Sequence, residues 1–303
     1  MTNTVLILGA GGKFGGQCAK TFAAAGWTVR RFDRKSQDMT QAAMGADVIV
    51  NGLNPPNYHN WDEIIPQITK DVIAAAKVSG ATVILPGNVY PFGDRPGVWD
   101  ENTPHQPNSR KGEIRKQMEA AYRAAAKDGV QTVNLRAGDI IDPDSSETMM
   151  RIVLFKDLAK GKMAYPGRTD IPHSWCYTPD FARAALALAK KRDSLNRYED
   201  IPFPGQTMSA DDIRAIVQNF LHKPVKVKNF PWWLLKISSP FWELARELNE
   251  MRYLWNTPHE LSGEKLRALL PDFEFTTPQQ AIANSLPFNI NPDKTVVASR
   301  LAV

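Results

Sequence analysis

The sequence predicts an α/β fold, a Rossmann doubly wound parallel sheet with a smaller helix-rich C-terminal lobe. Three observations support this prediction. A glycine-rich turn, GAGGKFG, joins a short apolar run to a helical pattern near the start of the chain. Apolar runs and helical patterns then alternate through the first half, as in a parallel sheet with right-handed crossovers. After Pro143 this alternation gives way to helical segments and proline-rich connections.

The first half contains five predicted strands, most of them continuous apolar runs typical of strands buried on both faces. They span residues 4–8, 27–32, 47–50, 81–85 and 131–135. Helical spacing predicts helices at 13–25, 61–77 and 112–127. Asp33 and Asp47 are only 14 positions apart, too few for a helix, a strand and their connections. We therefore expect an abbreviated sheet strand in this interval.

The second half is interpreted as a set of helices. They are predicted at 147–160, 179–191, 209–221 and 231–254. The last stretch, NINPDKTVVASRLAV, is expected to be a loosely held terminus, with an extended arm as the alternative.

Composition is that of an ordinary globular protein, with 43% apolar and 23% charged residues. The formal net charge of +5 is spread along the chain, so no nucleic-acid partner is expected. Cys18 and Cys176 lie far apart without a CxxC partner, which favours a reducing compartment and no metal site. The first residues lack the basic and apolar segments of a signal peptide. We therefore expect a cytoplasmic protein.

No window approaches the length of about 18 uninterrupted apolar residues that a membrane span requires. The nearest is FPWWLLKISSPFWEL, which Lys236 and Pro240 interrupt. This region is rich in aromatic residues: Trp232, Trp233, Phe241, Trp242, Tyr253 and Trp255. We expect most of them to be core or to line an apolar pocket. Exposure of WWLLK would instead indicate docking to a partner or to a membrane face.

The glycine turn has the spacing of a dinucleotide site. Gly9 permits the tight turn, Gly12 allows the backbone to approach a pyrophosphate, and Gly15 allows the helix to pack closely on the strand. The phosphates would lie at the helix N-terminus, where unpaired N–H groups and the helix dipole favour negative charge. The remaining residues predicted to contact the cofactor are Lys13, Phe14, Asn51, Gly52 and Leu53.

The residues after the second strand leave the choice between NAD and NADP open. Asp33 stands 18 positions after Gly15, where a carboxylate accepts hydrogen bonds from the ribose hydroxyls and repels a 2′-phosphate. Arg31, Arg34 and Lys35 flank it, and a guanidinium there can bind that phosphate when the carboxylate turns away.

Successive segments resemble the motifs of the extended short-chain dehydrogenase/reductase superfamily, which includes the NAD-dependent epimerases and dehydratases. These segments are GAGGKFG, GADVIVNG, VILPGNVYPFGD, ENTPHQP, LRAGDIIDP and HSWCYTPDFARA, within residues 3–190. The resemblance implies an NAD(P)-binding domain at 1–165, a substrate lobe at 166–303 with interleaved segments, and a homodimer. The helix predicted at 179–191 is expected to pack on the first domain.

In that family a Ser, Tyr and Lys relay moves the proton. When Glu119 is matched to the acidic residue that follows the family lysine, Lys111 takes the tyrosine position and Arg115 the lysine position. Asn88 takes the serine position, so all three members are replaced. Arg115 supplies charge but no proton. Lys111, with its pKa depressed by burial and by Arg115, is a candidate acid.

Other side chains are also candidates for the site. Tyr90 follows the strand that borders the nicotinamide in this fold and can replace the missing phenol, with packing under the loop as the alternative. Tyr122 lies too far along its helix. His173 is interpreted as a structural histidine or a general acid, and Asp180 as a helix cap or an anchor for the lobe. Asp139 stands where the resemblance implies an asparagine that contacts the substrate diphosphate, so a nucleotide sugar is disfavoured.

Two functions follow from these residues. The first is an NAD(P)-dependent, epimerase-like oxidoreductase that acts on a small carbonyl or alcohol. The second is a dinucleotide-binding sensor or scaffold that has lost hydride chemistry, which the substituted relay favours.

Overall fold

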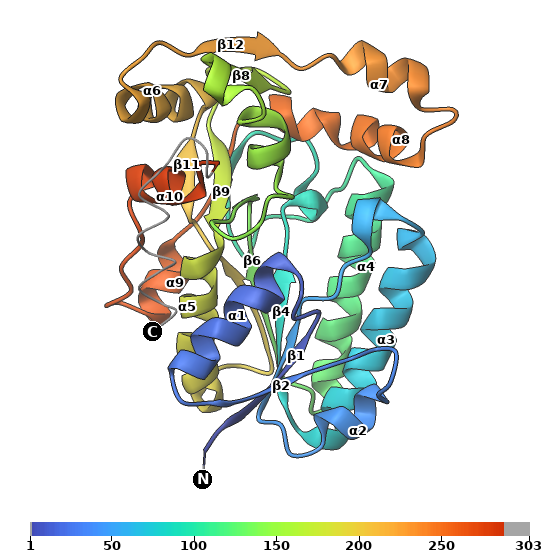
Figure 1. Ribbon diagram of the computed structural model, residues 1–303. Coiled ribbons are helices and arrows are strands. Elements are labelled where there is room, and N and C mark those ends of the chain that lie inside the picture. The colour runs from blue at the N-terminus through green and yellow to red at the C-terminus, as the bar shows by residue number, and fades with distance from the viewer. Residues whose placement is uncertain (1, 288–303) are drawn as a thin grey trace.

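The computed structural model describes residues 2–287, and its centre is a parallel six-stranded sheet with helices on both faces (Figure 1). The strands are β1 (Thr4–Leu8), β2 (Thr28–Arg31), β3 (Val48–Asn51), β4 (Thr82–Gly87), β6 (Thr132–Arg136) and β10 (Tyr198–Pro202). Their order across the sheet is β10-β6-β4-β3-β1-β2, and all neighbours are parallel. The five predicted strands and the Rossmann architecture are confirmed.

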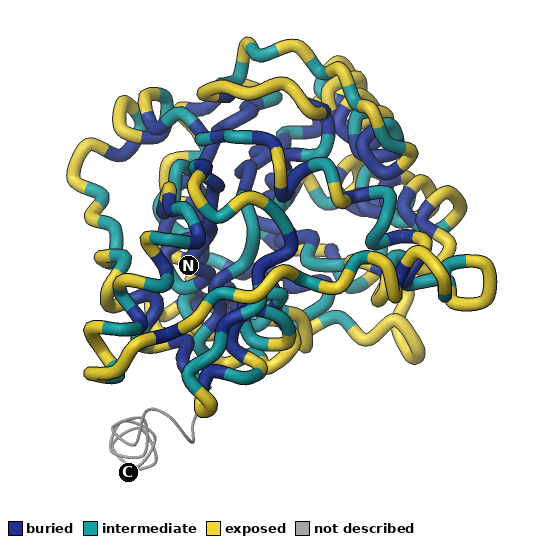
Figure 2. Tube along the Cα trace, turned by 90° about the horizontal axis from the view of Figure 1, so that it is seen from above, coloured by how far each residue is buried: buried dark blue, intermediate teal, exposed yellow. Residues whose placement is uncertain are grey.

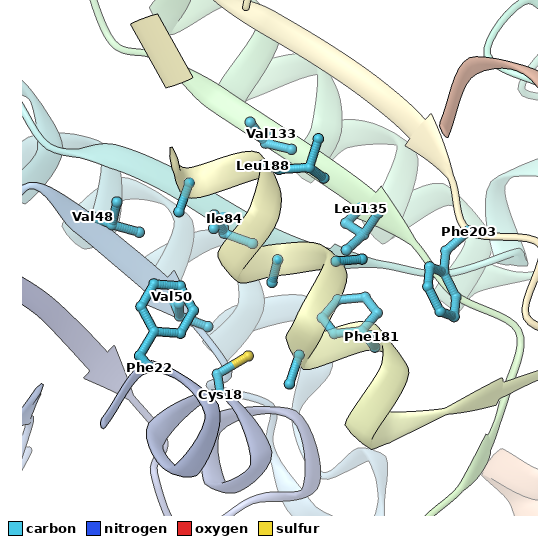
Figure 3. Packing of buried hydrophobic residues seen from close by; sticks show 14 of the residues in the cluster. Cys18, Phe22, Val48, Val50, Ile84, Val133, Leu135, Phe181, Leu188 and Phe203 are labelled. Carbon is cyan, nitrogen blue, oxygen red and sulfur yellow. The ribbon is translucent and has the colours of Figure 1, made fainter. Parts of the chain in front are cut away.

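Two apolar layers hold the helices on this sheet. On one face, α1 (Lys13–Ala24) and α5 (Thr178–Lys190) pack against each other and against the strands. Figure 3 shows Phe181 and Leu188 of α5 in the same cluster as Cys18 and Phe22 of α1. On the other face lie α2 (Met39–Ala43), α3 (Trp61–Ser79) and α4 (Arg110–Ala125). The predicted helices at 13–25, 61–77 and 112–127 are thus confirmed to within a few residues.

Within residues 2–287, the sheet lacks the strand that lies beyond β2 in the usual doubly wound order. Between β2 and β3 the only regular element is the five-residue α2, whose N-cap Asp38 accepts a hydrogen bond from the Gln41 N–H at 2.8 Å. The expectation of an abbreviated strand was therefore wrong, because a helix and two turns use the whole interval. β2 becomes an edge strand, and three of its four residues are exposed.

Short strands fill much of the second half. β7 (Asp139–Ile141), β9 (His173–Tyr177) and β11 (Gln206–Met208) form one small sheet. β8 (Lys162–Tyr165) pairs with β12 (Lys226–Asn229), and β5 (Gly97–Trp99) pairs with β13 (His259–Leu261). The helices there are α6 (Ala210–Leu221), α7 (Trp232–Ser238), α8 (Glu243–Glu250), α9 (Glu264–Leu269) and α10 (Pro278–Ser285).

Two of the predicted helices in this half were wrong. Residues 147–160 form a π-helical turn at Met150–Leu154 and a 3₁₀ turn at Leu158–Lys160. The stretch 231–254 is divided into α7, α8 and the 3₁₀ turn Met251–Asn256. Pro240 lies between α7 and α8, where its ring and missing N–H oppose a continuous helix. The predictions at 179–191 and 209–221 are confirmed as α5 and α6.

The two halves of the chain are interleaved. α5 and β10 follow residue 166 in sequence but belong to the layers of the first-half sheet. Asp180, at the start of α5, is buried and accepts hydrogen bonds from Thr276 N and Oγ1, both at 2.7 Å. This confirms it as an anchor for the C-terminal lobe. Seen from above, buried segments gather in the centre of the molecule and exposed ones form its rim (Figure 2).

Neither cysteine forms a disulfide, since Cys18 and Cys176 are free and buried. Among residues 2–287, no helix combines the length and apolarity that crossing a membrane requires. The predicted terminal arm or loose end at 289–303 lies outside the described residues.

A buried arginine joins the strand ends to α4. Arg136, at the end of β6, has no exposed surface and bonds Glu119 at 3.0 and 2.8 Å and Asp200 at 3.2 and 2.6 Å. Its guanidinium also lies 3.5 Å from His105 Nε2. His105, Glu119 and Asp200 are the only group in the described chain whose geometry could suit a metal ion. The guanidinium already binds both carboxylates.

We expect Arg136→Met to lower the free energy of unfolding by roughly 3–5 kcal/mol, because two buried carboxylates lose their partner. Urea denaturation measures this loss. Lys77→Ala, which breaks the exposed Lys77–Asp128 pair, is the matched control and should cost less than about 1 kcal/mol. Adding Glu119→Gln and Asp200→Asn to Arg136→Met should restore part of the stability. Equal losses in the two single variants would contradict this account.

Candidate functional site

The glycine turn brings three backbone segments into direct contact. Gly9 has φ +72°, and a Cβ built on it would lie 2.7 Å from the Gly52 carbonyl oxygen. A Cβ on Gly15 would lie 2.3 Å from the Gly9 carbonyl oxygen, and one on Gly52 would lie 2.9 Å from the Leu8 carbonyl oxygen. Glycine is therefore required at all three positions, and α1 can approach the ends of β1 and β3 only because of it.

The N-terminus of α1 has no side-chain cap. Gly12 is its N-cap residue, and the first turn contains no acidic side chain. The Gly12 N–H bonds the Gly9 carbonyl at 2.9 Å, and the helical ladder resumes with the Gly16 N–H on the Gly12 carbonyl at 2.7 Å. The N–H groups of Lys13, Phe14 and Gly15 between them have no intrahelical acceptor, which is the usual property of a first helical turn. This end of α1 is suited to hold an anion.

A hollow of about 420 Å³ opens beside this turn. One side is lined by Gly11, Gly12 and Lys13, and the other by the segment 142–147. Asp144 in that segment is bound by Lys20 Nζ at 2.6 Å and Gln17 Nε2 at 2.7 Å. The ion pair with Lys20 offsets the charge of Asp144, one of three acidic residues on that wall.

The loop after β2 holds its own carboxylate. Asp33 accepts hydrogen bonds from the Lys35 N–H at 3.0 Å and the Ser36 hydroxyl at 2.7 Å. These bonds, led by the one from Lys35, lower the pKa of the Asp33 carboxyl. Arg34 is exposed beside it. The Asp33 carboxylate is thus turned toward its own loop. In the sequence analysis, this is the arrangement that allows a flanking guanidinium to bind a 2′-phosphate.

The segment after β3 lies against the glycine turn on one side and α4 on the other. Asn51 is buried and donates to the Tyr122 hydroxyl at 3.1 Å, and its Oδ1 accepts from the Leu53 N–H at 3.3 Å. Gly52 is the residue that touches Gly9 and Gly15. The predicted cofactor residues Gly9, Gly12, Lys13, Phe14, Gly15, Asn51, Gly52 and Leu53 therefore converge on one edge of the sheet.

No protein-family model matches the chain, and no curated protein matches its sequence. Several solved structures do match it over almost its whole length. MoeE5 in complex with UDP-glucose and NAD is 14% identical with a TM-score of 0.75, and the match covers 97% of this chain and 99% of that one.

Two further structures give the same result. UDP-glucuronic acid 4-epimerase from Bacillus cereus, in complex with UDP-glucuronic acid and NAD, is 14% identical with a TM-score of 0.73, over 96% of this chain and 99% of that one. A nucleoside-diphosphate-sugar epimerase from Pseudomonas aeruginosa is 16% identical with a TM-score of 0.71, over 97% and 99%. This chain has the epimerase/dehydratase fold. The fold implied by the motif resemblance is confirmed.

Lys111, which the motif resemblance matches to the family tyrosine, forms ion pairs with α8. Its side chain has no exposed surface, and its ammonium contacts Glu247 and, at 2.5 Å, Glu250 of α8. The Lys111 N–H also donates to Glu250 Oε1 at 3.1 Å. Arg110 adds bonds to Glu247 at 3.0 and 3.1 Å. This geometry makes Lys111 the residue that anchors α8 to α4.

Arg115 is buried one turn further along α4. Its Nη2 donates to Asn54 Oδ1 at 2.7 Å, and its guanidinium stacks 4.8 Å from the Trp61 ring. Burial lowers the pKa of the Arg115 guanidinium, and the neighbouring Tyr90 and Glu119 side chains oppose that shift. The guanidinium nevertheless stays charged at neutral pH, so it supplies a fixed cation beside the predicted site.

Tyr90, a predicted site residue, is paired with a second tyrosine, Tyr58. The hydroxyls of Tyr58 and Tyr90 are 3.0 Å apart, and the Tyr90 N–H donates to Asn88 Oδ1 at 3.1 Å. Burial raises the pKa of Tyr90 well above its usual value, and Tyr58 adds to the shift. The Tyr90 phenol therefore stays protonated at neutral pH, and either hydroxyl can donate in the bond with Tyr58. The structure thus places Tyr90, Asn88 and Arg115 near one another, and Lys111 lies 5.1 Å from the Tyr58 ring.

Sequence reasoning missed Tyr58. It belongs to a segment in which Asn57, Tyr58 and Asn60 all have positive φ, of 55°, 61° and 44°. Left-handed backbone at non-glycine residues costs energy and often marks functional segments. The only signal in the sequence is the dipeptide Pro55-Pro56 ahead of two asparagines, which predicts a turn but no side-chain role.

Asp139 and His173, which were separate candidates in the sequence, form a contact. His173 Nε2 is hydrogen-bonded to Asp139 Oδ2, and the buried Nδ1 has no partner among the described residues. The His173 ring stacks on Trp255 at 4.9 Å. It also meets His259 edge to face, at 4.4 Å. Burial is the main cause of the raised pKa of both Tyr58 and Tyr90, and the nearby Asp139 charge adds to it.

His259 should make stability depend on pH. Burial and the neighbouring His173 lower the pKa of His259 from 6.5 to about 3. As the pH falls from about 6.5 to about 3, the unfolded chain binds this proton and the folded chain does not. The free energy of unfolding should therefore fall by a few kcal/mol over that interval, in addition to the effect of carboxylate protonation.

His259→Phe keeps a ring over Trp99 and removes this titration. Urea unfolding at a series of pH values should give a smaller loss of stability below pH 6.5 for the variant than for the natural chain. Parallel curves would show that His259 is protonated as easily in the folded state as in the unfolded one.

Proposed function

We propose that this chain binds NAD or NADP at the glycine turn and acts as an epimerase/dehydratase-like oxidoreductase on a small carbonyl or alcohol. The observation that carries the proposal is the glycine-capped N-terminus of α1, where the close contact of Gly9, Gly15 and Gly52 leaves unpaired N–H groups beside an open hollow. The matching structures MoeE5 and the Bacillus cereus epimerase were solved with NAD.

The residues present fit such a cofactor. The N–H groups of the first turn of α1 would bind the pyrophosphate, and Lys13 would add positive charge. Asp33 and Arg34 would face the adenosine ribose, and Asn51, Gly52 and Leu53 would line the edge between the two ends of the cofactor. When bound, the nicotinamide supplies hydride transfer. The role of the protein would be to orient the substrate, to polarise it and to donate or accept the proton.

The substrate is proposed to be smaller than a nucleotide sugar. The partly exposed Asp139 carboxylate stands where the fold's nucleotide-sugar enzymes are expected to hold the substrate diphosphate. A carboxylate there repels a diphosphate and instead accepts hydrogen bonds from hydroxyl or amino groups. The side chains around it are mainly aromatic, which suits a compact and partly apolar molecule.

The proton is proposed to pass through Tyr90, assisted by Tyr58. The Tyr90 hydroxyl is held by Tyr58, its backbone is held by Asn88, and Arg115 supplies the nearby positive charge. A neutral phenol can donate to a carbonyl oxygen as negative charge develops there. Lys111 as the acid would require its pairs with Glu247 and Glu250 to open, so its proposed contribution is to hold α8 over the Tyr58 segment.

A second candidate is a dinucleotide-binding sensor or scaffold without turnover. The ion pairs of Lys111 favour it, since the residue at the family tyrosine position has become a structural contact. Both candidates predict cofactor binding, and they differ only in catalysis.

We expect NADH or NADPH to bind with a change in nicotinamide fluorescence, and Gly12→Asp to weaken that binding by at least about tenfold. Aspartate is a favoured N-cap, so the variant should keep the stability of α1 while its carboxylate occupies the N–H groups and repels phosphate. Ala215→Asp, which adds the same charge on the exposed face of α6, is the matched control and should bind as the natural chain does. Failure of the natural chain to bind either cofactor would remove both candidate functions.

Turnover is tested with aldehydes, ketones, alcohols and UDP-glucose, followed by nicotinamide absorbance. Conversion of a small carbonyl or alcohol, reduced at least about tenfold by Tyr90→Phe, would support the enzyme and its donor. Tyr198→Phe removes another half-buried phenol, one whose hydroxyl has no hydrogen-bond partner among the described residues, and should leave the rate unchanged. Activity only on UDP-glucose would overturn the substrate proposal, and cofactor binding without any turnover would favour the sensor.

A further inference from the structure

The segment 223–246, here called the aromatic arm, gathers exposed apolar side chains at one end of the molecule. Among residues 2–287, ten large apolar side chains are exposed, and five of these lie within 233–242. They are Trp233 (63% exposed), Leu234 (47%), Ile237 (68%), Phe241 (95%) and Trp242 (49%). We expected most of the aromatic side chains here to be core, and this expectation was wrong for Trp233, Phe241 and Trp242. Apolar groups clustered on a surface mark an interaction site, whereas scattered ones do not.

The arm is a rigid platform and not a loose loop. Trp232 donates from Nε1 to the Pro166 carbonyl at 2.6 Å, and Leu235 is buried, so one side of α7 is fixed to the protein. α7 packs on α8, which the buried pairs of Glu247 and Glu250 hold to α4. In Figure 1, β12 and α7 lie along one end of the molecule with α8 directly beneath α7.

The geometry of α7 separates its two sides. At about 100° per residue, Trp233, Leu234 and Ile237 fall within one outward sector, and Trp232 and Leu235 fall on the opposite side. Lys236 stands at the edge of the outward sector. An outward stripe of Trp, Leu and Ile bordered by lysine is the pattern of a helix that lies in the headgroup region of a bilayer.

The charge of the arm is complementary to an anionic surface. It contains five exposed cations, Lys223, Lys226, Lys228, Lys236 and Arg246. Its single acidic residue, Glu243, is hydrogen-bonded to His59 at 2.9 Å. Within residues 2–287, Lys226, Lys228 and Lys236 form no ion pair with the protein. Their charge is therefore available to lipid headgroups, each at a favourable energy near an anionic membrane.

We infer that the aromatic arm binds the surface of membranes containing anionic phospholipids, with Trp233, Ile237 and Phe241 inserted among the acyl chains and the lysines on the headgroups. A second copy of the chain fits less well. A two-fold contact would place the same lysines opposite one another, and lysine is depleted at protein interfaces. Phe241, almost fully exposed between Pro240 and Trp242, suits entry into a fluid apolar phase. The inference does not depend on the proposed enzymatic function.

The test is flotation of the purified chain with vesicles of phosphatidylcholine alone and with vesicles that also contain phosphatidylglycerol. We expect binding to the anionic vesicles only, a shift of tryptophan fluorescence to shorter wavelength on binding, and loss of binding in high salt, where the screening length falls to about 3 Å at 1 M.

Two sets of variants separate the parts of the surface. Lys226→Gln, Lys228→Gln and Lys236→Gln together should weaken binding by about a hundredfold. Ile237→Ser with Phe241→Ser should weaken it by at least about tenfold. The matched controls alter exposed residues elsewhere: Lys70→Gln, Lys127→Gln and Lys190→Gln for charge, and Val98→Ser with Ile152→Ser for apolar surface. The controls should bind as the natural chain does, and circular dichroism checks that every variant is folded.

Three results would overturn the inference. One is no binding to anionic vesicles, and another is equal loss in the arm variants and their controls. The third is a dimer in sedimentation velocity that Ile237→Ser with Phe241→Ser dissociates while vesicles remain unbound, because the arm would then be an interface between copies of the chain.

Discussion

The contact between Gly9, Gly15 and Gly52 is the constraint on which the cofactor edge of the molecule depends. A side chain at Gly15 would collide with the Gly9 carbonyl at 2.3 Å, and one at Gly9 would collide with the Gly52 carbonyl at 2.7 Å. Backbone atoms cannot yield as a flexible side chain can, so the collision would move α1 away from the sheet. The position of the helix N-terminus, the hollow beside it and the course of the chain after β3 all follow from this contact.

Buried ion pairs join α4 to its neighbouring elements. Arg136 ties β6 to α4 and β10, and Lys111 ties α4 to α8. Arg136 and Lys111 are both fully buried, where an unpaired charge is costly and the ion-pair partners must remain together. The same pairs hold α8, and through it the aromatic arm, in place.

The site could be predicted where its residues are neighbours in sequence. The glycine turn is a local pattern, and the structure brings Gly9, Gly12 and Gly15 to the place that their spacing indicated. Asp139 and His173 are 34 positions apart, and Tyr58 and Tyr90 are 32 apart. Their contacts depend on the register of β7 with β9 and on a strained loop after β3, neither of which has a local signal. The partners of Lys111 lie farther still along the chain, on a helix whose limits the sequence did not predict.

By itself, the sequence determined the order of strands and helices in the first half and the dinucleotide-type turn. These features depend on apolar periodicity, glycine conformation and residue identity, which act over a few residues. The tertiary structure alone decided that Lys111 is an anchor and that Asp139 pairs with His173. It also decided that, among the described residues, no strand lies beyond β2 in the sheet, and that Trp233, Phe241 and Trp242 are exposed. Those outcomes depend on which buried charges and apolar faces find partners far along the chain, and pairing over such distances leaves no local pattern.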